Sequence, residues 1–153
     1  MFDVKLEGLD ALRSKMKRVD EALNEKLVRD SVTAGARKII KRAKAIVSAS
    51  DDPTTGRKIA SNLTYRYRRK YSKAVGGVVV SVGVATPKGK IPKGNPDEGN
   101  KGPTFHWHLL ELGAEHMRAQ PFLVPAAMQE APTLPQVIVD DLSKRLDKEV
   151  AKL

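Results

Sequence analysis

Three histidines and two glutamates lie close together in the second half of the 153-residue chain, and their types and spacing could hold a metal ion. They are His106, His108, Glu111, Glu115 and His116. On a helix, His108, Glu111 and Glu115 would fall at positions i, i+3 and i+7, close to one face. Two histidines and one carboxylate from the five residues could then form a zinc or iron site. A His-Glu-x-x-His motif is absent, however, and Gly113 would interrupt such a helix. We therefore interpret these side chains as surface and interface residues, and expect neither a metal nor another cofactor.

No other catalytic constellation occurs in the sequence. Cysteine is absent, which excludes a thiolate nucleophile, a cysteine zinc site and a disulfide framework. The glycines form neither a Walker loop nor a dinucleotide-binding fingerprint, and no Gly-x-Ser-x-Gly is present. We therefore predict a protein that is not an enzyme and has no catalytic residue.

The strongest chemical signal is the positive charge concentrated between residues 37 and 73. This stretch holds twelve basic residues against two aspartates, whereas residues 1–36 hold seven basic and seven acidic residues and residues 74–153 hold nine of each. A directed positive field favours an acidic partner, either nucleic acid or an acidic protein face. The candidate interface or DNA-path residues are Arg37, Lys38, Lys41, Arg42, Lys44, Arg66, Arg68 and Lys70.

Two interpretations of this basic stretch are open. It could bind the phosphates of duplex DNA without sequence specificity, and then binding would weaken with salt. It could instead be a charged surface that faces a neighbouring subunit or a lumen. We favour the second interpretation, because strand alternation places the nearby tyrosines, which could stack on bases, on the opposite face from the arginines.

A long N-terminal helix and a hairpin must position these basic residues. Apolar residues recur at spacings of three and four from Leu9 to Val47, which predicts an amphipathic helix with a kink or a join at Gly35. Loop residues follow at 48–56, and residues 56–63 form a short helical or extended connector.

A period of two then predicts an antiparallel hairpin. One face of the first extended segment carries Leu63, Tyr65, Tyr67 and Tyr71, and the other carries Thr64, Arg66, Arg68 and Lys70. Gly76-Gly77 offers a turn, and the valine-rich residues 78–85 form the second strand. We expect the tyrosines and valines to pack against the long helix.

The C-terminal half combines an exposed loop with helices. Residues 86–103 are rich in Pro, Gly, Lys and Asn, which predicts a long flexible loop. Core residues return at 105–112, a helix can run from Pro125, and a final helix is expected over 135–153. The anchors of the segment from residue 105 onward are expected to be Phe105, Trp107, Leu109, Leu112, Phe122 and Leu123.

The expected fold class is α+β, in a single domain of residues 1–153. A long N-terminal helix packs on a small antiparallel sheet, followed by C-terminal helices. Neither a signal peptide nor a run of 18 apolar residues is present, so we expect a soluble protein that its own signals do not export.

The C-terminal half contains two short motifs that resemble elements of a family of virion proteins. Glu111-Leu112-Gly113-Ala114 is similar to a Glu-Phe-Gly-Thr element, and Ala-Gln-Pro-Phe-Leu-Val-Pro-Ala at 119–126 is similar to an Ala-x-Pro-Phe-Leu-x-Pro-Ala element. Both elements occur in minor tail or tail-completion (head–tail joining) proteins of long-tailed double-stranded DNA phages, typified by the tenth gene product of an HK-type lambdoid coliphage. The chain departs from the family at residues 105–108, where Phe-His-Trp-His replaces Tyr-Ala, and in its longer 86–103 loop. In these two motifs the matching residues are Glu111, Gly113, Pro121, Phe122 and Pro125. In the loop after the long helix, Thr55, Gly56 and Ser61 also match a Thr-Gly-x-x-x-x-Ser element of the family.

This resemblance implies a structural virion protein of the phage neck or tail, assembled in the host cytoplasm. It implies a homo-oligomeric ring, expected to be hexameric, that completes the tail and joins it to the head connector while DNA passes through its lumen. The implied partners are the connector, tail-terminator or tail-tube proteins and the passing double-stranded DNA, with no membrane. The alternatives are a tail terminator or head-closure protein of the same neck, a small basic non-specific DNA-binding protein, and a metal-dependent hydrolase that uses the His/Glu cluster.

Overall fold

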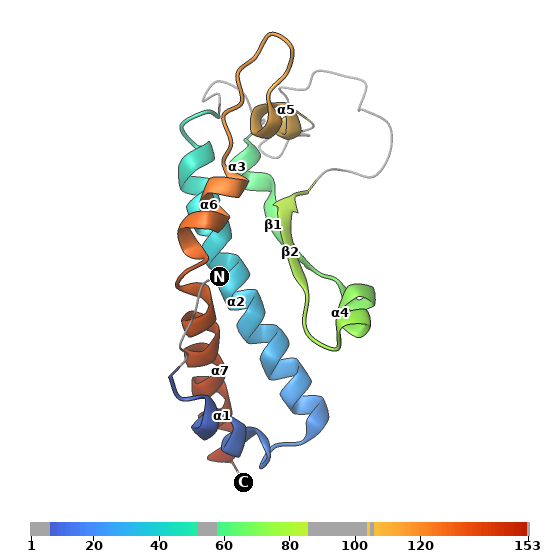
Figure 1. Cartoon of the computed structure of the whole chain (residues 1–153), viewed down its shortest axis with the longest axis vertical. Coiled ribbons are helices and arrows are strands. Elements are labelled where there is room, and N and C mark those ends of the chain that lie inside the picture. The colour runs from blue at the N-terminus through green and yellow to red at the C-terminus, as the bar shows by residue number, and fades with distance from the viewer. Residues whose placement is uncertain (1–6, 52–57, 86–103, 105, 153) are drawn as a thin grey trace. The chain divides into compact units, whose positions relative to one another are not determined.

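The computed structural model describes residues 7–51, 58–85, 104 and 106–152. The expected loop at 86–103, the motif residues Thr55 and Gly56, and Phe105 lie outside the described residues. In chain order the elements are α1 (Leu9–Met16), α2 (Glu21–Val47), α3 (Ile59–Asn62), β1 (Leu63–Tyr67), α4 (Arg69–Val75), β2 (Val80–Val84), α5 (Trp107–Leu112), α6 (Leu123–Glu130) and α7 (Leu134–Val150) (Figure 1). The predicted α+β class and the C-terminal helices are confirmed. None of the described helices is long and apolar enough to span a membrane.

The contacts of the chain form two compact units. Unit 1 comprises residues 1–38, 67–81 and 130–153, and unit 2 comprises residues 39–66 and 82–129. Helix α2 and the hairpin therefore contribute residues to both units. That the chain is one domain stays a prediction from its length.

Helices α1, α2 and α7 build the core of unit 1. Leu12, Leu27, Leu142 and Leu146 are its buried residues, and α1 packs along α7. Burying each such leucine contributes roughly 1.5–3 kcal/mol. A salt bridge also joins α1 and α7, because the ammonium group of Lys15 lies 2.7 Å from a carboxylate oxygen of Asp147.

The join between the two N-terminal helices lies at residues 17–20, so the prediction of a kink or join at Gly35 is wrong. Helix α2 runs unbroken through Gly35, which is buried. A Cβ atom at this position would lie 3.1 Å from Cγ1 of Ile138. The glycine lets α7 approach α2 closely, and this packing offsets the roughly 1 kcal/mol that glycine costs inside a helix.

The core of unit 2 surrounds Phe122, which is completely buried. Ala43 and Val47 of α2 belong to the same cluster, and from the hairpin Tyr65, Val82 and Val84 pack against it. This confirms the predicted packing of the hairpin against the long helix for Tyr65, Val82 and Val84.

The connector before β1 is the short helix α3. The carboxylate of Asp51 accepts hydrogen bonds from the backbone N–H groups of Ile59 at 2.8 Å and Ala60 at 3.1 Å, near the start of that helix. An acidic residue that precedes the helix thus satisfies donors that lack partners within it.

The hairpin is antiparallel, as predicted. The N–H group of Arg68 donates to the carbonyl of Val79, and the N–H group of Ala85 donates to the carbonyl of Asn62. Alternation also holds within β1, where Thr64 and Arg66 are exposed, whereas Leu63 is buried and Tyr65 and Tyr67 are half-buried.

The extended segment predicted up to Tyr71 is wrong beyond Tyr67, because Arg69–Val75 form helix α4. Ser72 lies on the buried side of this helix, where its hydroxyl accepts a 2.9 Å hydrogen bond from the N–H group of Val79. Helical periodicity therefore turns Tyr71 outward, and its side chain is 64% exposed. Gly76 ends the helix in the left-handed conformation at φ +64°, so the glycine pair caps α4 instead of forming a two-residue turn between strands.

Candidate functional site

A buried carboxylate, that of Glu111, holds the turn between α5 and α6 in unit 2 (residues 113–122), which we call the Glu111 turn. One oxygen of Glu111, Oε2, accepts hydrogen bonds from the N–H groups of Phe122 at 2.7 Å and Leu123 at 3.0 Å, and the other, Oε1, accepts one from Val124 at 3.0 Å. These donors lie at the start of α6, where backbone N–H groups lack partners within the helix. Glu111 therefore acts as an N-cap supplied from another helix, α5, and its negative charge suits the positive end of the helix dipole.

The glycine and a proline of the sequence motifs shape the same turn. Gly113 adopts φ +82°, and a Cβ atom there would lie 3.0 Å from the backbone nitrogen of Ala119. Pro125 lies in the first turn of α6, where its missing N–H group costs little. The helix begins at Leu123 instead of the predicted Pro125, because Glu111 supplies acceptors for the two preceding N–H groups.

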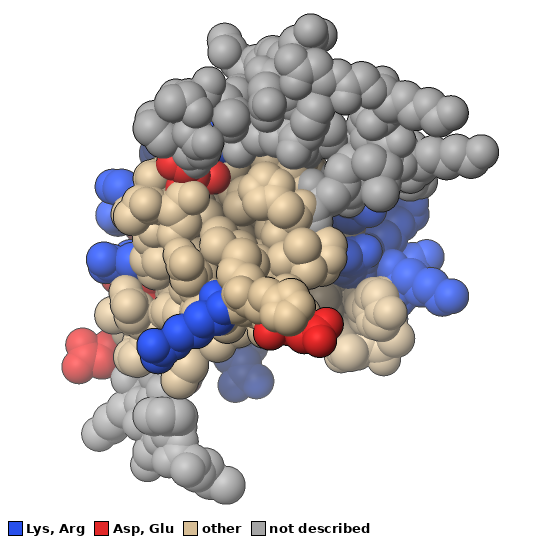
Figure 2. All heavy atoms as spheres, turned by 90° about the horizontal axis from the view of Figure 1, so that it is seen from above, with Lys and Arg blue, Asp and Glu red and all other residues tan. Residues whose placement is uncertain are grey.

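The Glu111 turn exposes a set of apolar side chains, which we call the apolar turn surface. Its members, with their exposed fractions, are Leu109 40%, Leu112 78%, Met117 37%, Val124 57% and Met128 71%. The prediction that Leu109 and Leu112 anchor the core is therefore wrong. The short helix α5 turns Trp107 and Leu110 toward the core, and this places Leu109 and Leu112 on its outer side. From above, Figure 2 shows uncharged side chains gathered at the centre, with most Lys and Arg side chains to the sides.

The histidines do not assemble a metal site with the glutamates in the described part of the chain. His106, His108 and His116 are exposed, and no group of three or more His, Asp or Glu residues among the described ones could hold a metal ion. The carboxylate of Glu111 is engaged by α6. Within this cluster, Glu111 therefore has a structural role in capping α6.

The basic residues of α2 form a regular exposed row. Arg37, Lys41 and Lys44 occupy positions i, i+4 and i+7 of one continuous helix and are exposed. We call them the α2 basic face. Arg42 is also exposed, one position after Lys41.

Lys38 has a structural partner instead. Its ammonium group lies 3.1 Å from a carboxylate oxygen of Glu130 and 3.0 Å from the hydroxyl of Thr133. Because Glu130 is only 6% exposed, this pair compensates a buried charge at the junction of α6 and α7.

Arg66, Arg68 and Lys70 do not form the predicted ladder on one strand. Arg66 lies on β1, Arg68 follows it, and Lys70 lies on α4. The guanidinium of Arg68 donates a 2.7 Å hydrogen bond to the hydroxyl of Ser81. The alternating sequence pattern did not predict that β1 ends at Tyr67 and that a helix follows. A glycine pair such as Gly76-Gly77 is, however, also a common signal for the end of a helix.

A comparison with protein families supports the resemblance noted in the sequence. The family model described as "Bacteriophage HK97-gp10, putative tail-component" matches residues 10–113, about two thirds of the chain. The matched segment contains Glu111 and Gly113 and ends before the Pro-Phe-Leu-Val-Pro-Ala motif. No curated protein and no solved structure matches the chain.

Proposed function

The chain belongs to the HK97-gp10-like family of bacteriophage tail components, and from this premise we propose that it forms a ring that completes the tail and joins it to the head connector. The ring is a homo-oligomer, expected to contain six copies. It works by binding neighbouring virion proteins, as a structural part of the virion, and it assembles in the host cytoplasm.

The apolar turn surface carries this proposal. Its five side chains come from one turn and the two helices that flank it, and exposed apolar patches on soluble proteins mark protein–protein contacts. Methionine is also enriched at interfaces relative to the rest of a protein surface. Because Glu111 and Gly113 fix the turn before any partner arrives, binding costs less conformational entropy than it would for a mobile loop.

The α2 basic face supports a path for DNA or a contact with an acidic neighbour. Its three cations lie in the stretch that holds the whole charge excess of +10. Lys and Arg side chains that face phosphates bind DNA without reading its sequence, which suits a lumen through which any DNA must pass. If the chain were a dedicated DNA-binding protein instead, it would bind duplex DNA with micromolar or tighter affinity near physiological salt, which a gel-shift titration against salt measures.

Complementation in a phage that carries the gene tests the assembly role. We expect Leu112→Glu combined with Val124→Glu to leave separate heads and tails in electron micrographs, because two carboxylates would be buried without partners at the interface. The matched control is Lys148→Glu, which reverses an exposed charge on α7. Circular dichroism of the purified variants must show wild-type helix content, and normal yields of joined virions from the double variant would refute the proposal.

A further inference from the structure

A groove in unit 1 lies between the start of α2 and the tip of the hairpin. It has a volume of about 390 Å³. Its apolar lining comes from Met16, Val28, Tyr67 and Val78. The guanidinium carbon of Arg29 lies 5.6 Å from the ring centre of Tyr67, a cation–π contact that holds the hairpin beside α2.

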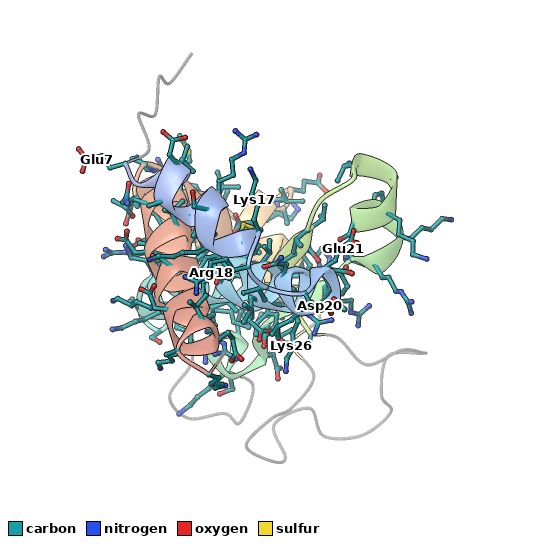
Figure 3. All side chains as sticks on the ribbon, turned by 90° about the horizontal axis from the view of Figure 1, so that it is seen from below. Glu7, Lys17, Arg18, Asp20, Glu21 and Lys26 are labelled. Atoms are coloured by element: carbon teal, nitrogen blue, oxygen red, sulfur yellow. The ribbon has the colours of Figure 1, made fainter. Side chains whose placement is uncertain are left out.

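The groove is acidic on its α2 side. Glu21 and Glu25 are exposed residues one helical turn apart, and both line the groove. Figure 3, seen from the end where α1 joins α2, shows Glu21 on the side of α2 that faces the hairpin. Among the described residues that line the groove, Lys73 of α4 is the one cation, so the two carboxylates give this lining a net negative charge.

Helix α4 exposes apolar and positively charged side chains, which complement the apolar and acidic lining of the groove. Tyr71 and Val75 lie one helical turn apart and are 64% and 68% exposed. Arg69 and Lys70 of the same helix are also exposed. The sequence contains no acidic residue from position 53 to position 96, so no carboxylate of the hairpin offsets these cations.

We propose that the groove of one copy receives the outer face of α4 from the next copy. Tyr71 and Val75 of the incoming helix cover the apolar lining, and Arg69 and Lys70 meet Glu21 and Glu25. This inference rests on the proposed ring and names its lateral contact. The two surfaces differ, so each copy uses one as donor and the other as acceptor, which is the head-to-tail arrangement that closes a ring.

The same observations disfavour other occupants. DNA phosphates would be repelled by the two glutamates of the groove, and phosphates alone give no reason for the exposed tyrosine and valine. Two α4 helices facing each other would bring their cations together. Tyrosine and arginine, by contrast, are the residues that most often dominate protein interfaces.

Charge reversal in the full-length chain tests the contact by sedimentation velocity. The groove variant carries Glu21→Lys and Glu25→Lys, and the α4 variant carries Arg69→Glu and Lys70→Glu. We expect each variant alone to self-associate about thirtyfold more weakly than the wild type, which corresponds to the loss of a dominant contact. In an equimolar mixture, the reversed groove meets the reversed helix and the native groove meets the native helix, so association returns.

Asp10→Lys is the matched control, because it reverses an exposed acid of α1 outside the groove. Any charge-reversal variant that loses helical circular dichroism is replaced by Glu25→Gln or Lys70→Gln. Wild-type association of both single variants, or a mixture that stays as weak as its components, would overturn the inference.

The absence of cysteine allows a second readout that needs no stable ring. Chains with Val75→Cys are mixed with chains that carry Glu25→Cys, and disulfide formation is followed on non-reducing gels. We expect the mixed pair to cross-link at least about tenfold faster than either variant with itself, a ratio that reflects a specific contact. Equal rates would overturn the groove contact, whereas the complementation result with Leu112 and Val124 decides the tail-joining role separately.

Discussion

Replacing Glu111 with glutamine tests whether this buried carboxylate holds the turn. The substitution keeps the shape of the side chain and one acceptor oxygen. If that oxygen takes the place of Oε2, it keeps the bonds to Phe122 and Leu123, and the new NH2 group faces the N–H group of Val124. One partly buried donor then loses its acceptor, and the favourable interaction of a full charge with the helix dipole is lost.

The expected loss of stability follows from these two effects. A donor without a partner costs about 1–3 kcal/mol where it is buried, and the partly buried N–H group of Val124 falls at the lower end of this range. The lost dipole interaction adds roughly 0.3–2 kcal/mol. Together they predict a loss of about 2 kcal/mol, which lowers the urea midpoint by about 1 M at a slope of about 2 kcal/mol per molar.

Trp107 provides the assay, because it is the only tryptophan and lies on α5 against the core of unit 2. Urea unfolding followed by its fluorescence reports on the unit that contains the substitution. Glu115→Gln is the matched control, since Glu115 is exposed and four residues away. If both variants unfold at the wild-type midpoint, the hydrogen bonds of Glu111 do not stabilise the turn and the reasoning fails.

Two further predictions concern a backbone position and a charge pair. Gly113→Ala should destabilise unit 2 by about 1–3 kcal/mol, because φ +82° with ψ 173° is a region open almost only to glycine, and an unchanged urea midpoint in the Trp107 assay would contradict this. Burial raises the pKa of Asp141, but the hydrogen bond and positive charge of Arg145 outweigh it and hold this pKa below the ordinary 3.8. The ionised carboxylate therefore stabilises unit 1 above about pH 4 and this contribution is lost as the pH falls through the lowered pKa, so Asp141→Asn should lose less stability than the wild type on acidification. Urea unfolding followed by circular dichroism between about pH 5 and pH 2 checks the sign, and parallel curves for the two proteins would refute it.

The helices that bury a long apolar stripe could be predicted from the sequence. The spacing of apolar residues in α2 and α7 repeats over many turns, so the pattern overrides local exceptions. Gly35 misled the prediction because glycine suits both a bend and a close helix contact, and only the position of Ile138 distinguishes them. Helix α4 was missed because its residues also fit a period of two over so short a length.

Only the motif residues of the site could be predicted from the sequence, and their structural roles could not. Glu111 and Gly113 were recognised as family residues, but their roles depend on contacts with residues beyond them in the chain. One local signal was available, since the residues that precede α6 are Gln120, Pro121 and Phe122 and none is a usual N-cap. A helix start without a local cap implies an acceptor from elsewhere, and the nearby Glu111 is an acidic candidate.

The Glu111 contact also bears on the timing of assembly. It joins residues only 11–13 positions apart, whereas the bond between Lys15 and Ser143 in unit 1 spans 128 positions. Short loops close quickly and at low entropic cost, so this turn forms early in folding. A newly made chain would therefore carry its apolar turn surface before its two ends have met. Under the assembly role proposed above, a partner must then cover this surface faster than free chains associate with each other.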